Sequence, residues 1–139
     1  MRISNVVAQG LMDYLLSHID SVTPTLYPRI EIYEGAYPST TGSPDGNLLI
    51  TITLKNPAFI INSNTGQELV YELDYPDPLT VTASGDASYF RLKNAANDTV
   101  LMGTVTGQAG SGDMKITTAT IRPSLLVRIT SFLIRLPKE

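Results

Sequence analysis

Beyond residue 28, apolar and polar residues alternate along most of this chain, and this alternation most constrains its fold. A period of two is typical of a β-strand because successive side chains point to opposite faces of a sheet. The clearest run is residues 48–54, whose predicted inward face holds alternate apolar side chains: Leu48, Ile50, Ile52 and Leu54. Thr51 and Thr53 are expected to face outward.

Similar runs recur at short spacing, separated by segments rich in Gly, Pro, Asn and Asp, which favour turns. We predict strands over residues 29–34, 48–54, 68–73, 79–83, 87–93, 99–105, 114–118 and 125–136, with residues 58–61 as a ninth. Residues 35–47 predict a long surface loop. Strands at this spacing, without a second helix, predict an all-β fold. We expect an antiparallel jelly-roll-like β-sandwich of about eight strands over residues 29–136.

One helix is predicted, over residues 4–19. Its apolar residues recur every four positions from Ile3 to Ile19, and Ser4 or Asn5 can cap its first turn. Gly10 weakens a helix by about 1 kcal/mol relative to Ala, so we expect the helix to need packing against another element. At 139 residues, the chain is expected to form a single domain over residues 1–139.

Composition excludes several kinds of chemistry. The chain has no Cys and one His, which excludes thiol nucleophiles and Cys-based metal sites. Its net charge of -3 argues against a general nucleic-acid partner. No run of about 18 apolar residues would span a membrane, and the first residues lack the pattern of a signal peptide. We therefore expect no metal, no cofactor, no nucleic acid and no membrane partner.

Candidate catalytic or ligand-binding residues each have a simpler structural explanation. His18 is expected to be a helix-end residue beside the negative end of the helix dipole. The turn carboxylates Asp74, Asp77 and Asp86 would suit glycoside chemistry or calcium, but Asp is also what turns require. The glycine-rich residues 103–113 lack the following helix that a phosphate loop needs, so we predict a flexible hairpin. We expect no enzymatic activity.

Charge and hydrophobicity single out the end of the chain. Residues 1–113 carry five basic and twelve acidic side chains, a net of −7, whereas residues 114–139 carry a net of +4. Either a basic strand pairs with acidic strands, or two faces dock to different partners.

Residues 125–136 are apolar on both faces and must be covered on both. The core would cover one face, and the helix, a neighbouring subunit or a partner would cover the other. The interface candidates, with plain core as the alternative, are Leu11, Leu15, Val127, Arg128, Ile129, Phe132, Ile134 and Arg135.

Several segments resemble a known group of proteins. In the second half these are residues 85–92 (Gly-Asp-Ala-Ser-Tyr-Phe-Arg-Leu), 100–105 (Val-Leu-Met-Gly-Thr-Val) and 112–116 (Gly-Asp-Met-Lys-Ile). In the first half they are residues 32–35 (Ile-Tyr-Glu-Gly), the run 48–54 and residues 57–59 (Pro-Ala-Phe). Over most of its length the chain resembles small virion proteins of tailed bacteriophages, in particular the capsid cement, or decoration, proteins of short-tailed phages.

This resemblance implies a non-enzymatic structural protein of the virion, located on the outer surface of the capsid. Its partners would be the major capsid protein, whose neighbouring capsomers it would bridge, and further copies of itself, as a homodimer or a trimer. The resemblance supplies no catalytic residues. The alternative hypothesis is a tail- or fibre-associated virion protein that binds a receptor or carbohydrate. Some of the seven tyrosines could then stack against sugars, although the lack of Trp disfavours this.

Overall fold

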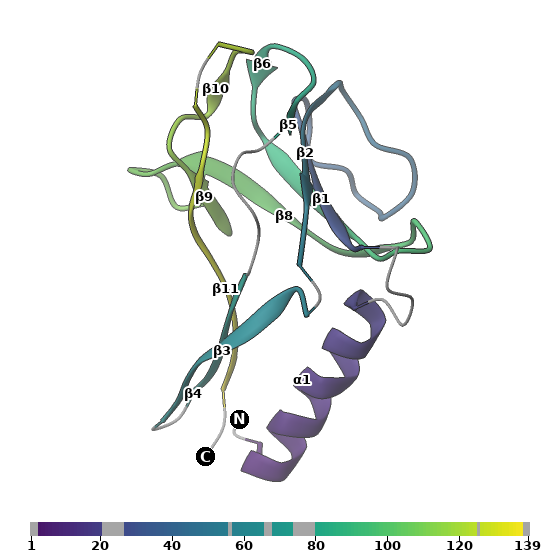
Figure 1. Cartoon of the computed structure of the whole chain (residues 1–139), viewed down its shortest axis with the longest axis vertical. Coiled ribbons are helices and arrows are strands. Elements are labelled where there is room, and N and C mark those ends of the chain that lie inside the picture. The colour runs from purple at the N-terminus through teal and green to yellow at the C-terminus, as the bar shows by residue number, and fades with distance from the viewer. Residues whose placement is uncertain are drawn as a thin grey trace.

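The computed structural model describes residues 3–20, 27–55, 57–65, 68–73, 80–124 and 126–137, without the side chains of residues 61–65, 68–73, 80 and 135–137. This part of the chain contains one helix and eleven strands (Figure 1). Their bounds are α1 Asn5–Ile19, β1 Arg29–Tyr33, β2 Leu48–Thr53, β3 Phe59–Thr65, β4 Glu68–Leu73, β5 Thr80–Val81, β6 Gly85–Asp86, β7 Tyr89–Lys93, β8 Thr99–Gly107, β9 Met114–Ile116, β10 Thr120–Ile121 and β11 Ile129–Pro137.

Nine of these strands form one sheet in the order β3-β4-β11-β9-β8-β7-β1-β2-β5, and β10 pairs separately with β6. The described pairings are antiparallel except that β8 and β9 run parallel. The prediction of a mostly β chain with one N-terminal helix is confirmed. The predicted count of about eight strands holds only when the two-residue strands β5, β6 and β10 are set aside.

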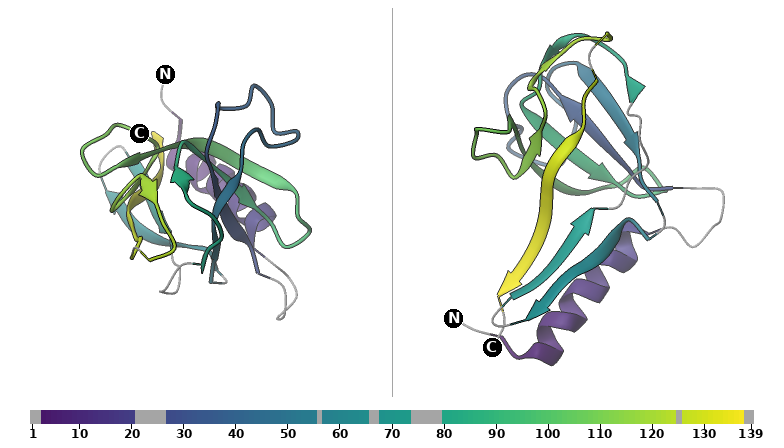
Figure 2. Two further views of the ribbon diagram at one scale, coloured as in Figure 1. Left: turned by 90° about the horizontal axis from the view of Figure 1, so that it is seen from above. Right: turned by 60° about the vertical axis from the view of Figure 1, so that its left-hand side comes forward.

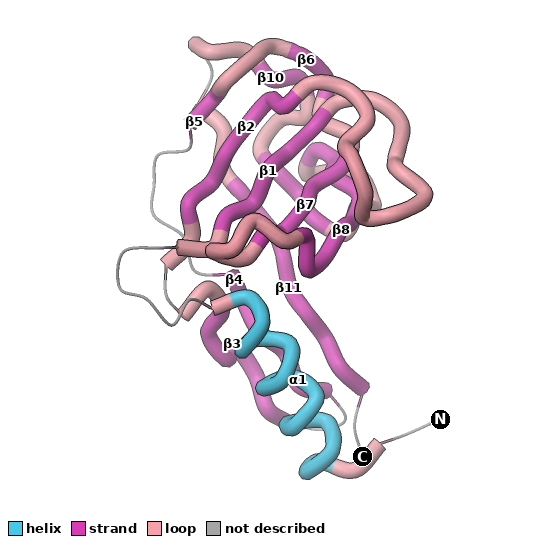
Figure 3. The backbone as a smooth tube through the Cα atoms, turned by 90° about the vertical axis from the view of Figure 1, so that its right-hand side faces the viewer, coloured by secondary structure: helices cyan, strands magenta, loops and turns pink. Residues whose placement is uncertain are grey.

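The long strand β11 joins two parts of the molecule. Its first residues, 129–132, lie beside β9, whereas residues 133–137 lie beside β4. The upper part in Figure 1, here called the body, is a curled sheet that includes β1, β2, β7, β8 and β9. The lower part, here called the arm, consists of β3, β4, the end of β11, and α1, which lies along these strands. Figures 2 and 3 show the same arrangement from other sides.

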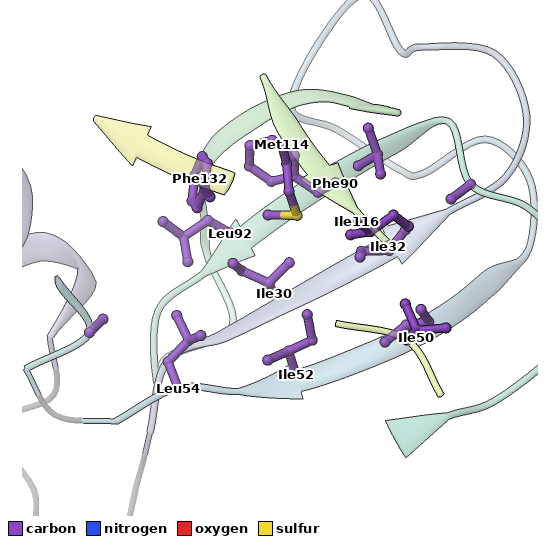
Figure 4. Packing of buried hydrophobic residues seen from close by; sticks show 14 of the residues in the cluster. Ile30, Ile32, Ile50, Ile52, Leu54, Phe90, Leu92, Met114, Ile116 and Phe132 are labelled. Atoms are coloured by element: carbon purple, nitrogen blue, oxygen red, sulfur yellow. The ribbon is translucent and has the colours of Figure 1, made fainter. Parts of the chain in front are cut away.

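The main core lies inside the curled sheet of the body. Figure 4 shows the apolar side chains that meet there, and the labelled ones come from five strands and the residue after β2: Ile30, Ile32, Ile50, Ile52, Leu54, Phe90, Leu92, Met114, Ile116 and Phe132. Burial of Ile50, Ile52 and Leu54 confirms most of the alternation predicted for residues 48–54. Leu48 is only half-buried and its neighbour Leu49 is fully buried, so the alternation fails at the first residues of β2.

The helix ends at the predicted Ile19 and begins at Asn5, one residue after the predicted start, with Ser4 as its N-cap. The Ser4 hydroxyl accepts a hydrogen bond from the backbone N–H of Val7 at 3.3 Å, which satisfies a donor that the first turn otherwise leaves unpaired. At the other end, the N–H of Asp20 donates to the carbonyl of Leu16 at 2.8 Å. The Asp20 carboxylate then accepts a hydrogen bond from the N–H of Ala58 at 2.8 Å, which ties the end of α1 to the residue before β3.

Residues 103–113 do not form the predicted hairpin. A hairpin requires antiparallel strands, but the chain turns back after Gly107 and starts β9 parallel to β8, with Met114 beside Val105. Side chains hold this return: the Asp113 carboxylate accepts hydrogen bonds from the N–H and hydroxyl of Thr104, at 2.8 and 2.9 Å. The Thr106 hydroxyl accepts a third hydrogen bond, from the N–H of Gly112, at 3.0 Å. The connection between β8 and β9 is therefore a loop held in place by side-chain hydrogen bonds.

Candidate interaction surface

The helix α1 buries one face and leaves an apolar face uncovered. Ala8, Met12 and Ile19 are at most 2% exposed, and Met12 and Ile19 belong to the main core cluster. On its other side the helix exposes four large apolar side chains, by 84%, 50%, 52% and 68%, respectively: Val6, Val7, Leu11 and Tyr14. We call these four residues and Gly10 the helix stripe. A surface helix normally carries polar side chains there, so the stripe is an unusual surface.

Little charge interrupts the helix stripe. Asp13 is the one charged residue of α1, and its carboxylate accepts a hydrogen bond from the side-chain amide of Gln9 at 2.8 Å. The His18 ring, one turn after Tyr14, lies edge-on to the Tyr14 ring with centroids 4.6 Å apart. A Cβ atom added at Gly10 would meet no atom within 4 Å. The middle of the stripe is thus flat and open, and its ends are apolar or aromatic.

The interface candidates of the last strand divide between core and surface. Val127 and Phe132 are 3% and 6% exposed and belong to the core. The Phe132 ring lies edge-on to the rings of Phe59 and Phe90, at centroid distances of 5.7 and 4.9 Å. Val127 and Phe132 are thus covered within one copy of the chain, which favours the core alternative for both.

The other candidates on this strand are less buried. Ile129 and Ile134 are half-buried and pack against the core cluster. Arg128 is exposed, and its backbone bonds Thr117: the Arg128 carbonyl accepts from the Thr117 N–H at 2.9 Å. Residues 126–128 therefore precede β11, which begins at Ile129 and not at residue 125 as predicted. Arg135 lies in β11 opposite Val70, and its side chain is outside the described part of the structure.

The two helix candidates also differ from each other. Leu15 is half-buried and packs against the core cluster, whereas Leu11 is 52% exposed in the helix stripe. The arrangement of α1 along the arm makes the helix one cover for the end of β11 (Figures 1 and 2). The helix is one of the covers expected for this strand, so the apolar character of the strand is not by itself evidence for a partner protein. The unpartnered apolar surface is instead on the helix itself.

Strand pairing also bears on the separation of charge. β4, which contains Glu68 and Glu72, pairs antiparallel with β11, which contains Arg135. This register places an acidic strand beside the basic end of the chain, as expected if the charges pair internally. Lys115 in β9, Arg122 after β10 and Arg128 before β11 add positive charge, and the exposed Asp86, whose strand β6 pairs with β10, adds negative charge.

A second candidate site is the polar face of β1 and β7, whose burial was not predicted from the sequence. Glu31 and Arg91 are 7% and 2% exposed, because loop 34–47 covers this side of the sheet. The Glu31 carboxylate binds three donors: Arg29 Nε at 3.0 Å, the Tyr33 hydroxyl at 2.6 Å and Lys93 Nζ at 3.2 Å. The carboxylate is thus fully engaged within the protein.

The same face fastens the loop. Arg91 donates to the carbonyls of Thr41 and Gly42. The Tyr89 hydroxyl accepts from the N–H of Asp45 at 2.9 Å and donates to its carbonyl at 2.5 Å. The Tyr89 ring also stacks on the ring of Tyr33, with centroids 5.3 Å apart. These contacts confirm a long loop over residues 35–47, but they attach it firmly to the sheet.

The protonation states of Glu31, Tyr33 and Tyr89 match the hydrogen bonds that these side chains make. Burial raises the pKa of Glu31. Hydrogen bonds from Tyr33, Arg29 and Lys93, together with the Lys93 charge, lower it by more, so the pKa lies below its ordinary 4.5. Burial, the hydrogen bond to Glu31 and the Glu31 charge raise the pKa of Tyr33 above its ordinary 10.0. Burial likewise raises the pKa of Tyr89. Glu31 is therefore ionised and the tyrosines neutral at neutral pH, which is the state that their hydrogen bonds require.

The remaining candidates form no site among the described residues. Asp86 is exposed in β6, and Asp74 and Asp77 lie outside the described residues. His18 is exposed at the end of α1, as predicted. No group of three His, Asp or Glu side chains that could hold a metal ion occurs in the described segments. No helix in those segments has the length and apolar character needed to cross a membrane.

The fold and the helix stripe together define a mostly β chain whose one helix carries an uncovered apolar face. No family model, no curated protein and no solved structure matches this chain. Val6, Val7 and Tyr14 were not among the predicted interface residues. Their signal was nevertheless present in the sequence, because α1 carries these apolar residues in addition to those of the face that holds Met12 and Ile19, and one buried face does not account for both sets.

Proposed function

We propose that this protein is a non-enzymatic capsid cement protein, which binds the outside of a phage head and stabilises it by bridging neighbouring capsomers. The helix stripe carries the assembly part of this proposal, because four exposed apolar side chains with one charged neighbour form a surface suited to contact with protein. The capsid part of the proposal rests on the resemblance to decoration proteins of residues 32–35, 48–54, 57–59, 85–92, 100–105 and 112–116.

The body suits a protein that works by attachment. Its loop 34–47 is held down by Arg91 and Tyr89, and its β8–β9 connection by Thr104 and Asp113. A rigid body loses little conformational entropy when it binds, and many copies on one rigid shell gain from each neighbouring contact. The jelly-roll topology is part of the proposal, and the attachment role does not depend on it.

Two exposed arginines of the body provide a second contact in this proposal. Arg122 directly follows β10, and Arg128 directly precedes β11. An acidic patch on the shell would attract these arginines and orient the incoming protein. Raising the salt concentration should then slow binding to the shell. Added salt shortens the distance over which exposed charges attract one another, which is about 8 Å at physiological ionic strength.

Heads that lack this protein provide the test. Purified protein is mixed with such heads, and bound protein is measured after sedimentation of the particles. The heads are then heated while DNA release is followed with a fluorescent dye. The proposal expects saturable binding and a higher temperature of DNA release. Failure of the protein to sediment with the heads would contradict it.

The alternative role, carbohydrate binding at a tail or fibre, has a specific observation in its favour. Tyr27 and Tyr37 are 46% and 49% exposed and offer aromatic surface for sugars. A glycan array separates the two proposals. Selective binding of one sugar class, lost in Tyr37→Ala, would favour the alternative, and no binding to any glycan would favour the cement protein.

A further inference from the structure

We propose that the helix stripe is the contact between two copies of this chain, which pair through antiparallel α1 helices around a two-fold axis near Gly10 and Leu11. This inference rests on the proposed function for its purpose, since a two-fold dimer offers two identical surfaces and can bridge two capsomers. Dimer formation itself is a property of the isolated protein and is measured without any capsid.

The spacing of the stripe is self-complementary. Val7 and Tyr14 lie two turns apart on one face of the helix, about 10 Å along its axis. Gly10 and Leu11 lie midway between them. A two-fold axis through this midpoint brings residue 7 of one copy to residue 14 of the other, and residue 10 to residue 11. Each large side chain then meets a smaller one: Tyr14 meets Val7, and Leu11 meets Gly10.

Gly10 supports a close approach of the two helices. No atom lies within 4 Å of a Cβ added at Gly10, so the space above it is free to receive Leu11 of a second copy. The glycine destabilises the helix, but its lack of a side chain allows a close helix–helix contact. A parallel pair would set Tyr14 against Tyr14 and align the two helix dipoles. An antiparallel pair opposes the dipoles, so the antiparallel arrangement is favoured.

The exposed apolar area agrees with what a dimer needs. From the exposed fractions of Val6, Val7, Leu11 and Tyr14, the stripe presents roughly 300–400 Å² of apolar surface per copy. A standard interface buries about 800 Å² per partner, of which roughly 60% is apolar. The four side chains thus supply most of the apolar part, and Gln9, Asp13 and Ser17 beside them supply a polar rim.

The helix is accessible to a second copy over its length. In Figure 3, α1 lies in front of the strands of the arm, and no other element lies in front of it. Figure 1 shows the same side of the helix facing away from β3 and β4. A second helix can therefore lie against α1 without displacing any described part of the chain.

Analytical ultracentrifugation of the full chain tests the inference. We expect the wild type to change from 15.1 kDa to twice this mass as its concentration rises through the micromolar range. Leu11→Asp should weaken the dimer at least about twentyfold, because it buries an unpaired charge in the interface. The matched control is Leu126→Asp, since Leu126 is also an exposed leucine, at 66%, but lies in the body; it should leave the dimer unchanged.

Gly10→Ala separates folding from pairing. Alanine favours the helix and meets no neighbour within one copy, so the variant should melt at a higher temperature than the wild type. Its methyl group would occupy the space of the partner's Leu11, so its dimer should be about tenfold weaker. A higher melting temperature with an unchanged or tighter dimer would contradict the inference.

Crosslinking tests the antiparallel register, because the chain has no cysteine of its own. Copies with Val7→Cys, mixed with copies with Tyr14→Cys, should form an oxidised heterodimer, and neither variant alone should crosslink efficiently. Efficient crosslinking of Val7→Cys to itself would overturn the antiparallel arrangement.

The outcomes also separate this inference from the proposed function. A wild type that stays monomeric, while Leu11→Asp loses binding to heads, would mean that the stripe docks on the shell; the dimer would be wrong and the cement role would stand. A dimer that binds no heads would support the inference and contradict the cement role. A trimer would overturn the two-fold arrangement.

Discussion

Replacing Glu31 with glutamine tests whether the buried polar face of β1 and β7 stabilises the fold through charge. The Glu31 carboxylate binds Arg29, Tyr33 and Lys93 at distances between 2.6 and 3.2 Å, and its side chain is 9% exposed. Glutamine has the same shape but no charge, and its amide nitrogen cannot accept a hydrogen bond. Glu31→Gln therefore removes at least one acceptor and both ion pairs without opening a cavity.

The expected loss in free energy of unfolding at pH 7 is about 2 kcal/mol, since hydrogen bonds to charged groups contribute about 1.5–3 kcal/mol each. The loss is smaller than for a fully buried ion pair, because Lys93 and Arg29 are 13% and 29% exposed and still reach water. For a chain of this length, about 2 kcal/mol corresponds to a fall in Tm of roughly 6–10 °C.

The difference should depend on pH. Folding lowers the pKa of Glu31 below 4.5, so its contribution is fully present above pH 4.5 and is lost as the pH falls through the folded-state pKa. Below that pKa the wild-type side chain is itself neutral, and the gap between wild type and Glu31→Gln should shrink toward zero. Urea unfolding at a series of pH values from 7 to 3, followed by circular dichroism, measures this gap.

The control is Asp86→Asn, at an exposed carboxylate in β6. It should change the free energy of unfolding by no more than about 0.5 kcal/mol at any pH, as surface substitutions usually do. A Glu31→Gln deficit that stays constant from pH 7 to pH 3 would refute the assignment of this stability to the charge.

Three further substitutions test the fold. Phe132→Ala should cost about 3–5 kcal/mol in urea unfolding, because it empties the aromatic contact in the core. Gly46→Ala should cost about 2 kcal/mol in the same assay, because Gly46 has φ +89° and its added Cβ would overlap the carbonyl of Glu34. Arg91→Lys should raise the hydrogen-exchange rate of loop 35–47 about tenfold, because lysine cannot replace both carbonyl contacts of the guanidinium.

For each of these three substitutions, one result would contradict the expectation. A Phe132→Ala variant as stable as the wild type would place this ring at the surface. A Gly46→Ala variant without loss would mean that the turn before Asn47 tolerates a side chain. Unchanged exchange in Arg91→Lys, measured by mass spectrometry, would mean that the loop is held without this arginine.

The parts of the fold that local sequence determines were predictable. The four-residue spacing predicted the helix to within one residue at its start, and the strand predicted over residues 68–73 matches β4 residue for residue. The parallel return of β9 was not predictable, because it depends on a side-chain contact between Thr104 and Asp113 that no period encodes. Turn residues indicated that the chain bends there, but not in which direction the next strand runs.

Burial on the second face of β1 was also missed. In the strand predicted over residues 29–34, Ile30 and Ile32 alternate with Glu31, and this pattern indicates only one inward, apolar face. Glu31 is buried because loop 34–47 folds back over it and is held by Arg91, about 50 positions later in the chain. Contacts between residues so distant in sequence leave no local periodic signal.

The exposed apolar face of α1 was predicted only in part. Leu11 was singled out and is exposed, whereas Val127 and Phe132 are core residues. Periodicity marks which positions are apolar, and it does not say which of two apolar faces the chain covers. For α1 that choice depends on how the arm folds against the helix, and it leaves Tyr14 outside.

Electron cryo-microscopy of heads incubated with this protein tests the central claim most directly. The account predicts density on the outer surface of the shell, in pairs of copies whose α1 helices run antiparallel, with Gly10 and Leu11 at the two-fold axis. Single copies with α1 exposed to solvent would contradict the dimer. Heads without added density, at protein concentrations that saturate any specific site, would contradict the cement role itself.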